Sequence, residues 1–169
     1  GHYGDALARM IYRVRPYERE PGATDRLAAK WAKRASANIL SGNFLRFELN
    51  MVRMIREFDR LPLRETPRRP RVGLVGEILL KSHPDANNNA AGIVEAEGGE
   101  VVSTDIMDFI FYCFYDNIFD YRHLAGQRKD SLEALASIAF LELTRMGLRL
   151  AFALSTRFSA PLSFKQLRS

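Results

Sequence analysis

The chain has 169 residues, 47% of them hydrophobic and 27% charged, and this ordinary globular composition predicts one domain, or two small lobes, with a substantial core. No apolar run approaches the roughly 20 residues that cross a bilayer, and no secretory leader is visible, so we expect no membrane partner. The only cysteine, Cys113, can form no internal disulfide and cannot alone hold zinc or an iron–sulfur cluster, which indicates a reducing, cytoplasmic setting.

The net charge of +5 is unevenly distributed along the chain. Residues 1–71 hold 16 Lys/Arg and 8 Asp/Glu, whereas residues 72–169 hold 9 and 12. The simplest interpretation is a solvated helical face that is rich in arginine. Alternatively, the two parts attract one another, or the basic part meets an acidic partner.

The first two predicted helices follow from apolar side chains at helical spacing. Residues 5–14 show this spacing, and Pro16 ends the helix because proline disfavours helical geometry at the residue before it. After a Pro-Gly turn, a second helix should begin at an N-cap, Thr24 or Asp25, and run to about Leu40.

A third helix is predicted over residues 44–59, which completes a helical part of residues 1–66. The side chains expected to face inward from the three helices are Leu7, Met10, Ile11, Val14, Leu27, Trp31, Ala35, Ile39, Phe44, Phe47, Met51, Met54, Ile55 and Phe58.

A connector rich in proline and arginine leads to an α/β part, residues 70–165. The apolar run 72–75 predicts a strand that is covered on both faces. A helix from about residue 87 to 97 should end at the Gly98-Gly99 pair, and a second strand should follow over 100–104. A strand–helix–strand unit requires a parallel pair with a right-handed crossover.

Two further helices are predicted, over residues 105–121 and 130–157. The first is dense in aromatic side chains, and we expect it to lie in the core rather than at a partner's surface, with Cys113 as a small buried hydrophobic residue. The tail from residue 158 should be irregular.

The predicted fold class is therefore α/β, with a helical N-terminal part followed by a Rossmann-like βαβ unit that has few parallel strands and long covering helices. Because a two-stranded sheet is marginal by itself, either helices cover it or further strands come from another copy or from other parts of a longer protein.

The polar loop after the first strand is the main candidate site, because ligands of open α/β sheets bind beyond the carboxyl ends of the strands. Gly76 would let a ligand approach the backbone. Glu77 could accept hydrogen bonds from a ligand or act as a general base, or it could cap a helix or pair with an arginine. His83 is either a proton donor near neutral pH or an exposed loop residue, extended because Pro84 follows it.

The same loop contains Asn87, Asn88 and Asn89, whose side chains can cap the following helix or help to bind an anion at its N-terminus. Arg13 and Arg15 are a second candidate, because guanidinium groups suit phosphate and carboxylate. The alternative for both arginines is ion pairing with nearby glutamates or contact with the α/β part.

Almost the whole chain resembles one segment of the large acyl-CoA dehydratase activase-related proteins, relatives of the 2-hydroxyglutaryl-CoA dehydratase system. Residues 10–18, with Arg-x-Arg-Pro-Tyr-Glu, are similar to the first motif of that family. Residues 71–78, followed by His83-Pro84 and the asparagine run, are similar to its "VGxVGEI…P…NN" pattern, and residues 98–102 resemble a third element.

The resemblance implies an internal piece of a multidomain protein of anaerobic bacteria. In that system an ATP-using activase with a [4Fe–4S] cluster passes electrons to a dehydratase. This chain has neither a cysteine-bearing loop nor an actin-type phosphate loop, so we expect the iron–sulfur and ATP sites outside it and no catalysis within it.

The expected function is that of a non-catalytic scaffold or ligand-binding domain of a CoA-substrate-specific enzyme activase-related protein. Its partners would be other domains of the parent protein, a dehydratase, a CoA-type or phosphate-bearing ligand, or a second copy of the chain. The alternative is a nucleic-acid-binding module that uses the basic first part, supported by Arg60, Arg64, Arg68, Arg69 and Arg71, although no DNA- or RNA-reading motif is present.

Overall fold

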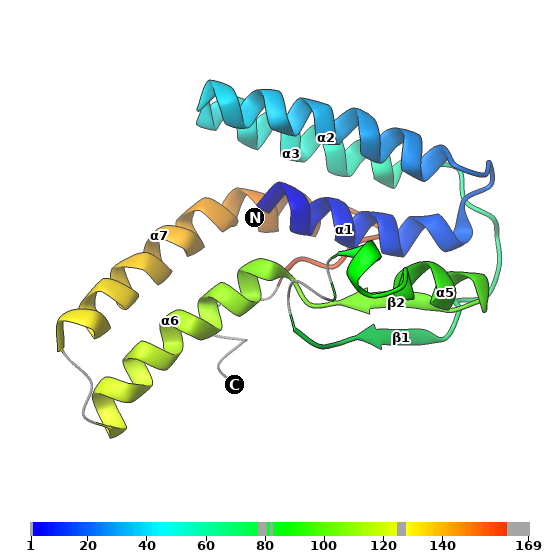
Figure 1. The fold of residues 1–169 in the computed structure, drawn as a ribbon. Coiled ribbons are helices and arrows are strands. Elements are labelled where there is room, and N and C mark those ends of the chain that lie inside the picture. The colour runs from blue at the N-terminus through cyan, green and yellow to red at the C-terminus, as the bar shows by residue number, and fades with distance from the viewer. Residues whose placement is uncertain (1, 78–80, 82, 125–127, 162–169) are drawn as a thin grey trace.

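The computed structural model describes residues 2–77, 81, 83–124 and 128–161, and 69% of the structure is helical, with a small two-stranded parallel sheet (Figure 1). This mixture of helices and parallel strands confirms the broad α/β expectation. The end of the predicted irregular tail, residues 162–169, lies outside the described part, as does Ile78 of the second motif.

The first part of the chain forms the predicted helices. They are α1 (His2–Val14), continued by the 3-10 turn η1 (Arg15–Tyr17), then α2 (Ala23–Ser41) and α3 (Phe44–Asp59). The bounds of α3 are those predicted, and Asn43 caps it by accepting a hydrogen bond from the backbone N–H of Arg46 at 2.8 Å. For α3, the spacing of apolar residues and a local N-cap therefore account for the helix.

The predicted N-cap of α2 is wrong. Neither Thr24 nor Asp25 is the N-cap. The N-cap is Gly22, whose backbone is in a left-handed conformation with φ of 78°. The carboxylate of Glu18 takes over, because it accepts from the backbone N–H groups of Gly22 at 2.6 Å and Thr24 at 2.9 Å. A glutamate from the preceding turn thus satisfies N–H groups at the start of the helix.

The sheet pairs β1 (Arg71–Leu74) with β2 (Glu100–Ser103) in parallel, with Arg71 opposite Glu100. The connection contains the short 3-10 turn η2 (Pro84–Ala86) and helix α5 (Ala90–Ala96). The parallel strand–helix–strand unit is confirmed, although α5 is shorter than predicted.

The prediction that the first strand is covered on both faces is wrong, since Val72 is 41% exposed. Helix α5 lies over one face (Figure 1), where the side chains of Val94 and Val72 both approach Gly99. Side chains alternate along a strand, so Arg71 and its partner Glu100 lie on the opposite face. The long helices do not cover that face.

These long helices are α6 (Ile106–His123) and α7 (Arg128–Ala153), which pack on each other and project from the rest of the molecule (Figure 1). The expectation that the aromatic helix is core is wrong for most of its rings, because α6 buries a stripe that includes Phe111 and leaves the opposite side open. Its exposed aromatic residues are Phe109, Tyr112, Phe119 and Tyr121. Cys113 is also exposed rather than buried.

The main core joins the beginning and the end of the chain. Buried side chains of α1, α2 and α3, including Trp31 and Phe58, pack with Leu148 and Phe152 of α7 and with Phe158. A second, smaller core lies between α6 and α7 and consists of Phe111, Ile118, Ala134 and Ile138.

Two predicted core residues are exposed, Ile39 at 69% and Phe44 at 54%. Both lie at the end of the α2–α3 pair that extends beyond α1 (Figure 1), where helical periodicity continues although α1 no longer lies beside it. The ring of Phe44 stacks on Phe47 of its own helix, with ring centroids 6.0 Å apart. Among the described residues, no helix is both long and apolar enough to cross a membrane.

Candidate functional site

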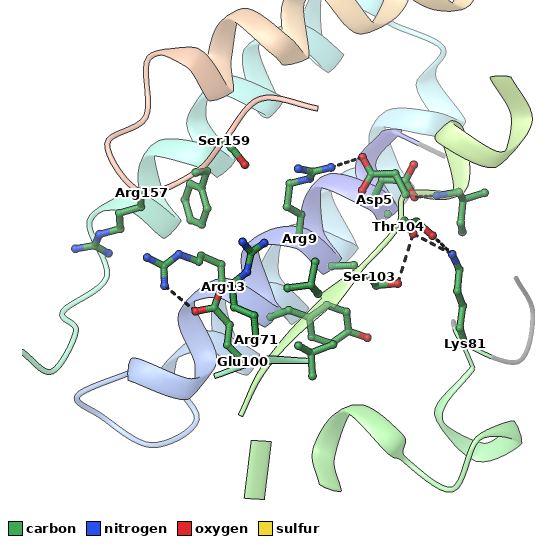
Figure 2. Close-up of a pocket in the computed structure, with 18 of the residues that line it drawn as sticks. Asp5, Arg9, Arg13, Arg71, Lys81, Glu100, Ser103, Thr104, Arg157 and Ser159 are labelled. Atoms are coloured by element: carbon green, nitrogen blue, oxygen red, sulfur yellow. Dashed lines mark hydrogen bonds and ion pairs between the residues drawn. The ribbon is translucent and has the colours of Figure 1, made fainter. Parts of the chain in front are cut away.

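A cavity of about 560 Å³ lies against the sheet face opposite α5 (Figure 2). One side of α1, residues 157–159 near the end of the described chain, and β2 with the residues after it surround the cavity. Helix α1 contributes residues at positions 4, 5, 8, 9, 12 and 13, which is the spacing of a single helical face.

Cations outnumber carboxylates in the lining of this pocket. Six basic side chains line it, namely Arg9, Arg13, Arg68, Arg71, Lys81 and Arg157. Three carboxylates, Asp5, Glu100 and Asp105, lie among them. The pocket is therefore positively charged, although each carboxylate is already engaged with protein groups.

At the amino end of β2, Glu100 is buried and collects donors from three separate segments. Arg68 donates from Nη2 at 2.9 Å and from Nε at 3.3 Å, Arg13 donates at 3.2 Å, and the hydroxyl of Tyr17 donates at 2.7 Å. The guanidinium of Arg71 lies 3.9 Å from the same carboxylate. Burial alone would raise the pKa of Glu100, but the hydrogen bonds from Arg68 and Tyr17 and the charge of Arg13 lower it.

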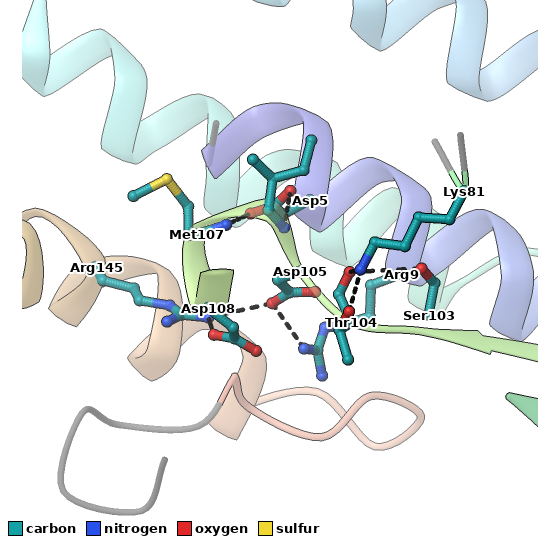
Figure 3. A network of polar contacts seen from close by, with 10 residues as sticks. Asp5, Arg9, Lys81, Ser103, Thr104, Asp105, Met107, Asp108 and Arg145 are labelled. Carbon is teal, nitrogen blue, oxygen red and sulfur yellow. Dashed lines mark hydrogen bonds and ion pairs between the residues drawn. The ribbon is translucent and has the colours of Figure 1, made fainter. Parts of the chain in front are cut away.

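At the carboxyl end of β2, Asp105 joins two arginines (Figure 3). Its Oδ2 lies 2.7 Å from Nη2 of Arg9 and 3.1 Å from Nη2 of Arg145, and Arg145 also contacts Asp108 at 2.7 Å. This network connects α1, the end of β2 and both long helices. Its central cation, Arg145, is buried, with only 1% of its surface exposed.

The start of α6 is capped from α1 rather than by its own preceding residue. Asp5 accepts hydrogen bonds from the backbone N–H groups of Ile106 at 3.1 Å and Met107 at 2.9 Å. Burial raises the pKa of Asp5, while these two hydrogen bonds act in the opposite direction. Because Asp5 caps α6, the carboxylate of Asp105 is not needed as the cap and instead binds Arg9 and Arg145.

Lys81 reaches the same end of the pocket from the polar loop. Its side chain is buried, and its ammonium donates to the hydroxyl and the backbone carbonyl of Thr104, groups that carry no net charge (Figure 3). A buried ammonium with neutral partners is costly unless a negative group compensates it. Lys81 is therefore the strongest single indication of an anionic ligand.

The predicted loop residues lie outside the lining of this pocket. Gly76 and Glu77 are exposed, and His83 is exposed and extended, as expected before Pro84. The loop after β1 was predicted to form the candidate site. Of its described residues, only Lys81 lines the pocket.

The three asparagines have structural roles. Asn87 accepts a hydrogen bond from the backbone N–H of Ala90 at 3.1 Å and donates to the carbonyl of Lys81 at 3.2 Å. Asn88 and Asn89 both have φ of 54°, a left-handed conformation that asparagine tolerates better than most residues. Their ligand-binding role remains a hypothesis, and none of the three lines the pocket.

Gly76 has φ of 136°, which side chains rarely adopt. Gly76→Ala should therefore lower the free energy of unfolding by about 2 kcal/mol. Backbone strain alone would be the cause, since no atom of the described residues lies within 4 Å of the new Cβ. Gly73→Ala is the matched control, with equally open space but no positive φ. Urea unfolding of both variants tests this, and equal midpoints would contradict it.

Arg13 and Arg15 both contact the α/β part. Arg13 pairs with Glu100, and Arg15 forms a two-point contact with Glu95 of α5, at 2.7 Å and 3.0 Å. With Arg9 and Arg68, they are basic residues of the first 71 that bind carboxylates of the later part. Attraction between the oppositely charged parts is therefore seen in these contacts, and a solvated arginine face does not describe them.

The sequence did not single out Lys81, Glu100 or Asp105, which organise the pocket. For Glu100 and Asp105, the available signal was a carboxylate before and after the short uncharged run Val101-Val102-Ser103-Thr104. Among the described residues, no group of three or more His, Cys, Asp or Glu side chains could hold a metal ion. Comparisons with protein-family models, curated proteins and solved structures found no match to this chain.

Proposed function

We propose that this chain is a non-catalytic ligand-binding domain of an acyl-CoA dehydratase activase-related protein, and that its pocket holds an anionic ligand of the CoA type. The observation that carries the proposal is the cationic cavity of about 560 Å³ beside β2, with the buried ammonium of Lys81 facing neutral partners. Cavities of this size suit small molecules.

The contacts of Glu100 support the family assignment. Each of the three motifs that carry the resemblance supplies a residue to this cluster: Arg13 and Tyr17 come from the first, Arg71 from the second and Glu100 from the third. Because these residues contact one another in the fold, the three motifs are expected to occur together in one sequence.

The finer description of the fold belongs to this proposal. The parallel pair with α5 in its connection is taken as a Rossmann-like βαβ unit, whose ligand lies near the carboxyl ends of the strands. Partners are then other domains of the parent protein or a dehydratase, and the iron–sulfur and ATP sites of that system lie outside this chain.

Calorimetric titration with CoA, CoA thioesters and nucleotides tests the binding function. Lys81→Met should weaken binding about 10- to 100-fold, since it removes a charged hydrogen-bond donor. Lys33→Met, at an exposed position of α2, is the matched control and should leave affinity unchanged. Absence of heat at millimolar concentration with every ligand would leave only a scaffold role.

A further inference from the structure

The two ends of β2 present different cations to the pocket. Figure 2 shows Arg13, Arg71 and Glu100 on one side of the pocket and Lys81 with Thr104 on the other. The ligand proposed above would contact both ends if it were long enough.

At the amino end, Arg71 is not hydrogen-bonded to the carboxylate of Glu100. Of the four hydrogen bonds that Arg68, Arg13 and Tyr17 donate to this carboxylate, three reach Oε2 and one reaches Oε1. Among the described residues Arg71 donates no hydrogen bond, and its 3.9 Å distance from Glu100 is that of an ion pair only. Three guanidinium groups around one carboxylate leave an excess of positive charge.

Arg71 therefore presents a planar set of donors to the pocket. Such a fork matches the oxygens of phosphate or carboxylate in two-point contacts. Its side chain is 56% exposed, so a ligand can reach it, whereas Glu100 at 3% holds Arg68 and Arg13 in place behind it.

At the carboxyl end, Lys81 is 9% exposed and bonds to Thr104. An ammonium has three donors, so one remains beyond the two acceptors of Thr104. The nearby Asp105 pairs with Arg9 and Arg145, both through Oδ2, and among the described residues no carboxylate forms an ion pair with Lys81. A second anionic group of the ligand would neutralise Lys81.

The strand sets the distance between these two positions. Arg71 is opposite Glu100 in the register, and Thr104 follows Glu100 by four residues. At about 3.3 Å per residue, the two ends are about 13 Å apart. A single phosphate group is too short to contact both.

We infer that the ligand is an elongated molecule with an anionic group at each end: a phosphate bound by Arg71, and a second phosphate or a carboxylate bound by Lys81. This inference rests on the proposed ligand-binding function of the same pocket. It adds the length of the ligand and the position of its charges.

Alkane-α,ω-diphosphonates of increasing chain length, with methylphosphonate as the single-headed reference, are suitable probes. Calorimetry on the unaltered chain at low salt should show affinity rising with length to an optimum, at which the diphosphonate binds about 100-fold more tightly than methylphosphonate because the second contact is intramolecular. This series requires no variant to fold.

Two variants locate the two ends. Arg71→Gln and Lys81→Met should each reduce the affinity for the best diphosphonate at least 10-fold, while Arg53→Gln and Lys33→Met, both at exposed helix positions, should not. Thermal unfolding confirms that each variant is folded.

The outcomes separate this inference from the function on which it rests. A diphosphonate that binds no better than methylphosphonate, or that responds to only one of the two variants, overturns the two-ended ligand and leaves the anion pocket. Absence of heat with all phosphonates, CoA compounds and nucleotides overturns both.

Discussion

Glu100→Gln should lower the free energy of unfolding by about 3 kcal/mol, the low end of the range for removing one partner of a buried ion pair. Glutamine keeps the size of the side chain but cannot balance the guanidinium groups of Arg13, Arg68 and Arg71. Those arginines are partly solvated, which limits the cost. Equilibrium unfolding in urea at neutral pH measures the difference.

Glu97→Gln is the control for this substitution. Glu97 lies three residues earlier in the exposed turn after α5, so its replacement should change stability by no more than about 0.5 kcal/mol. Equal stabilities of the two variants would mean that the cluster around Glu100 is not an energetic unit.

The effect of Glu100 should also depend on pH. Its pKa is below the ordinary value of 4.5 in the folded protein, so the unfolded chain binds the proton more readily. The stabilisation is complete above about pH 4.5 and is lost as the pH falls through the folded-state pKa. The difference between the parent protein and Glu100→Gln should therefore shrink in acid, and a constant difference down to pH 3 would contradict this.

Arg145→Met should also destabilise the protein by about 3 kcal/mol, because a methionine of similar length removes the buried cation that pairs with Asp108 and leaves Asp105 with Arg9 alone. Arg145 contacts Asp105 and Asp108 and lies over the ring of Phe111, with its guanidinium carbon 5.4 Å from the ring centre.

Burial, together with the charge of Arg145, lowers the pKa of His2 to about 4, so this histidine is neutral at pH 7.

The double variant Asp108→Asn/Arg145→Met tests whether the loss comes from an unpaired charge. Burial raises the pKa of Asp108, so converting it to a neutral amide should recover at least half of the loss. Arg149→Met, one turn further along α7, removes a longer contact of 3.6 Å to Glu142 and should cost less than about 1 kcal/mol. A double variant as unstable as the single one would show that shape, and not charge, is the cause.

Local sequence signals predicted where the helices begin and end better than which of their apolar side chains are buried. The periodicity of α3 gave its bounds, and Met51, Met54 and Phe58 are buried as expected. The same periodicity predicted Phe44 inside, where it is exposed, because spacing identifies an apolar face but not whether another element packs against it. The aromatic side chains of α6 were misplaced for that reason.

The candidate site was predicted in outline only. The parallel pair and its polar loop were expected, and the loop does send Lys81 to the pocket. However, the hydrogen-bond partners of Glu100 come from residues 32 to 87 positions away in the chain, and no local pattern contains such pairs. The asparagine run attracted attention for its composition, whereas two of its members are explained by left-handed backbone geometry.

The hairpin of α6 and α7 has a consequence for local opening. Its outer half is held by a core of four residues, whereas its base is joined to the main body through Arg145 and Leu148. Regions with few buried contacts open without global unfolding. Backbone amides around Ile118 and Ala134 should therefore exchange with deuterated solvent well before those around Leu148, so that the projecting hairpin behaves as a separate unit of native-state opening.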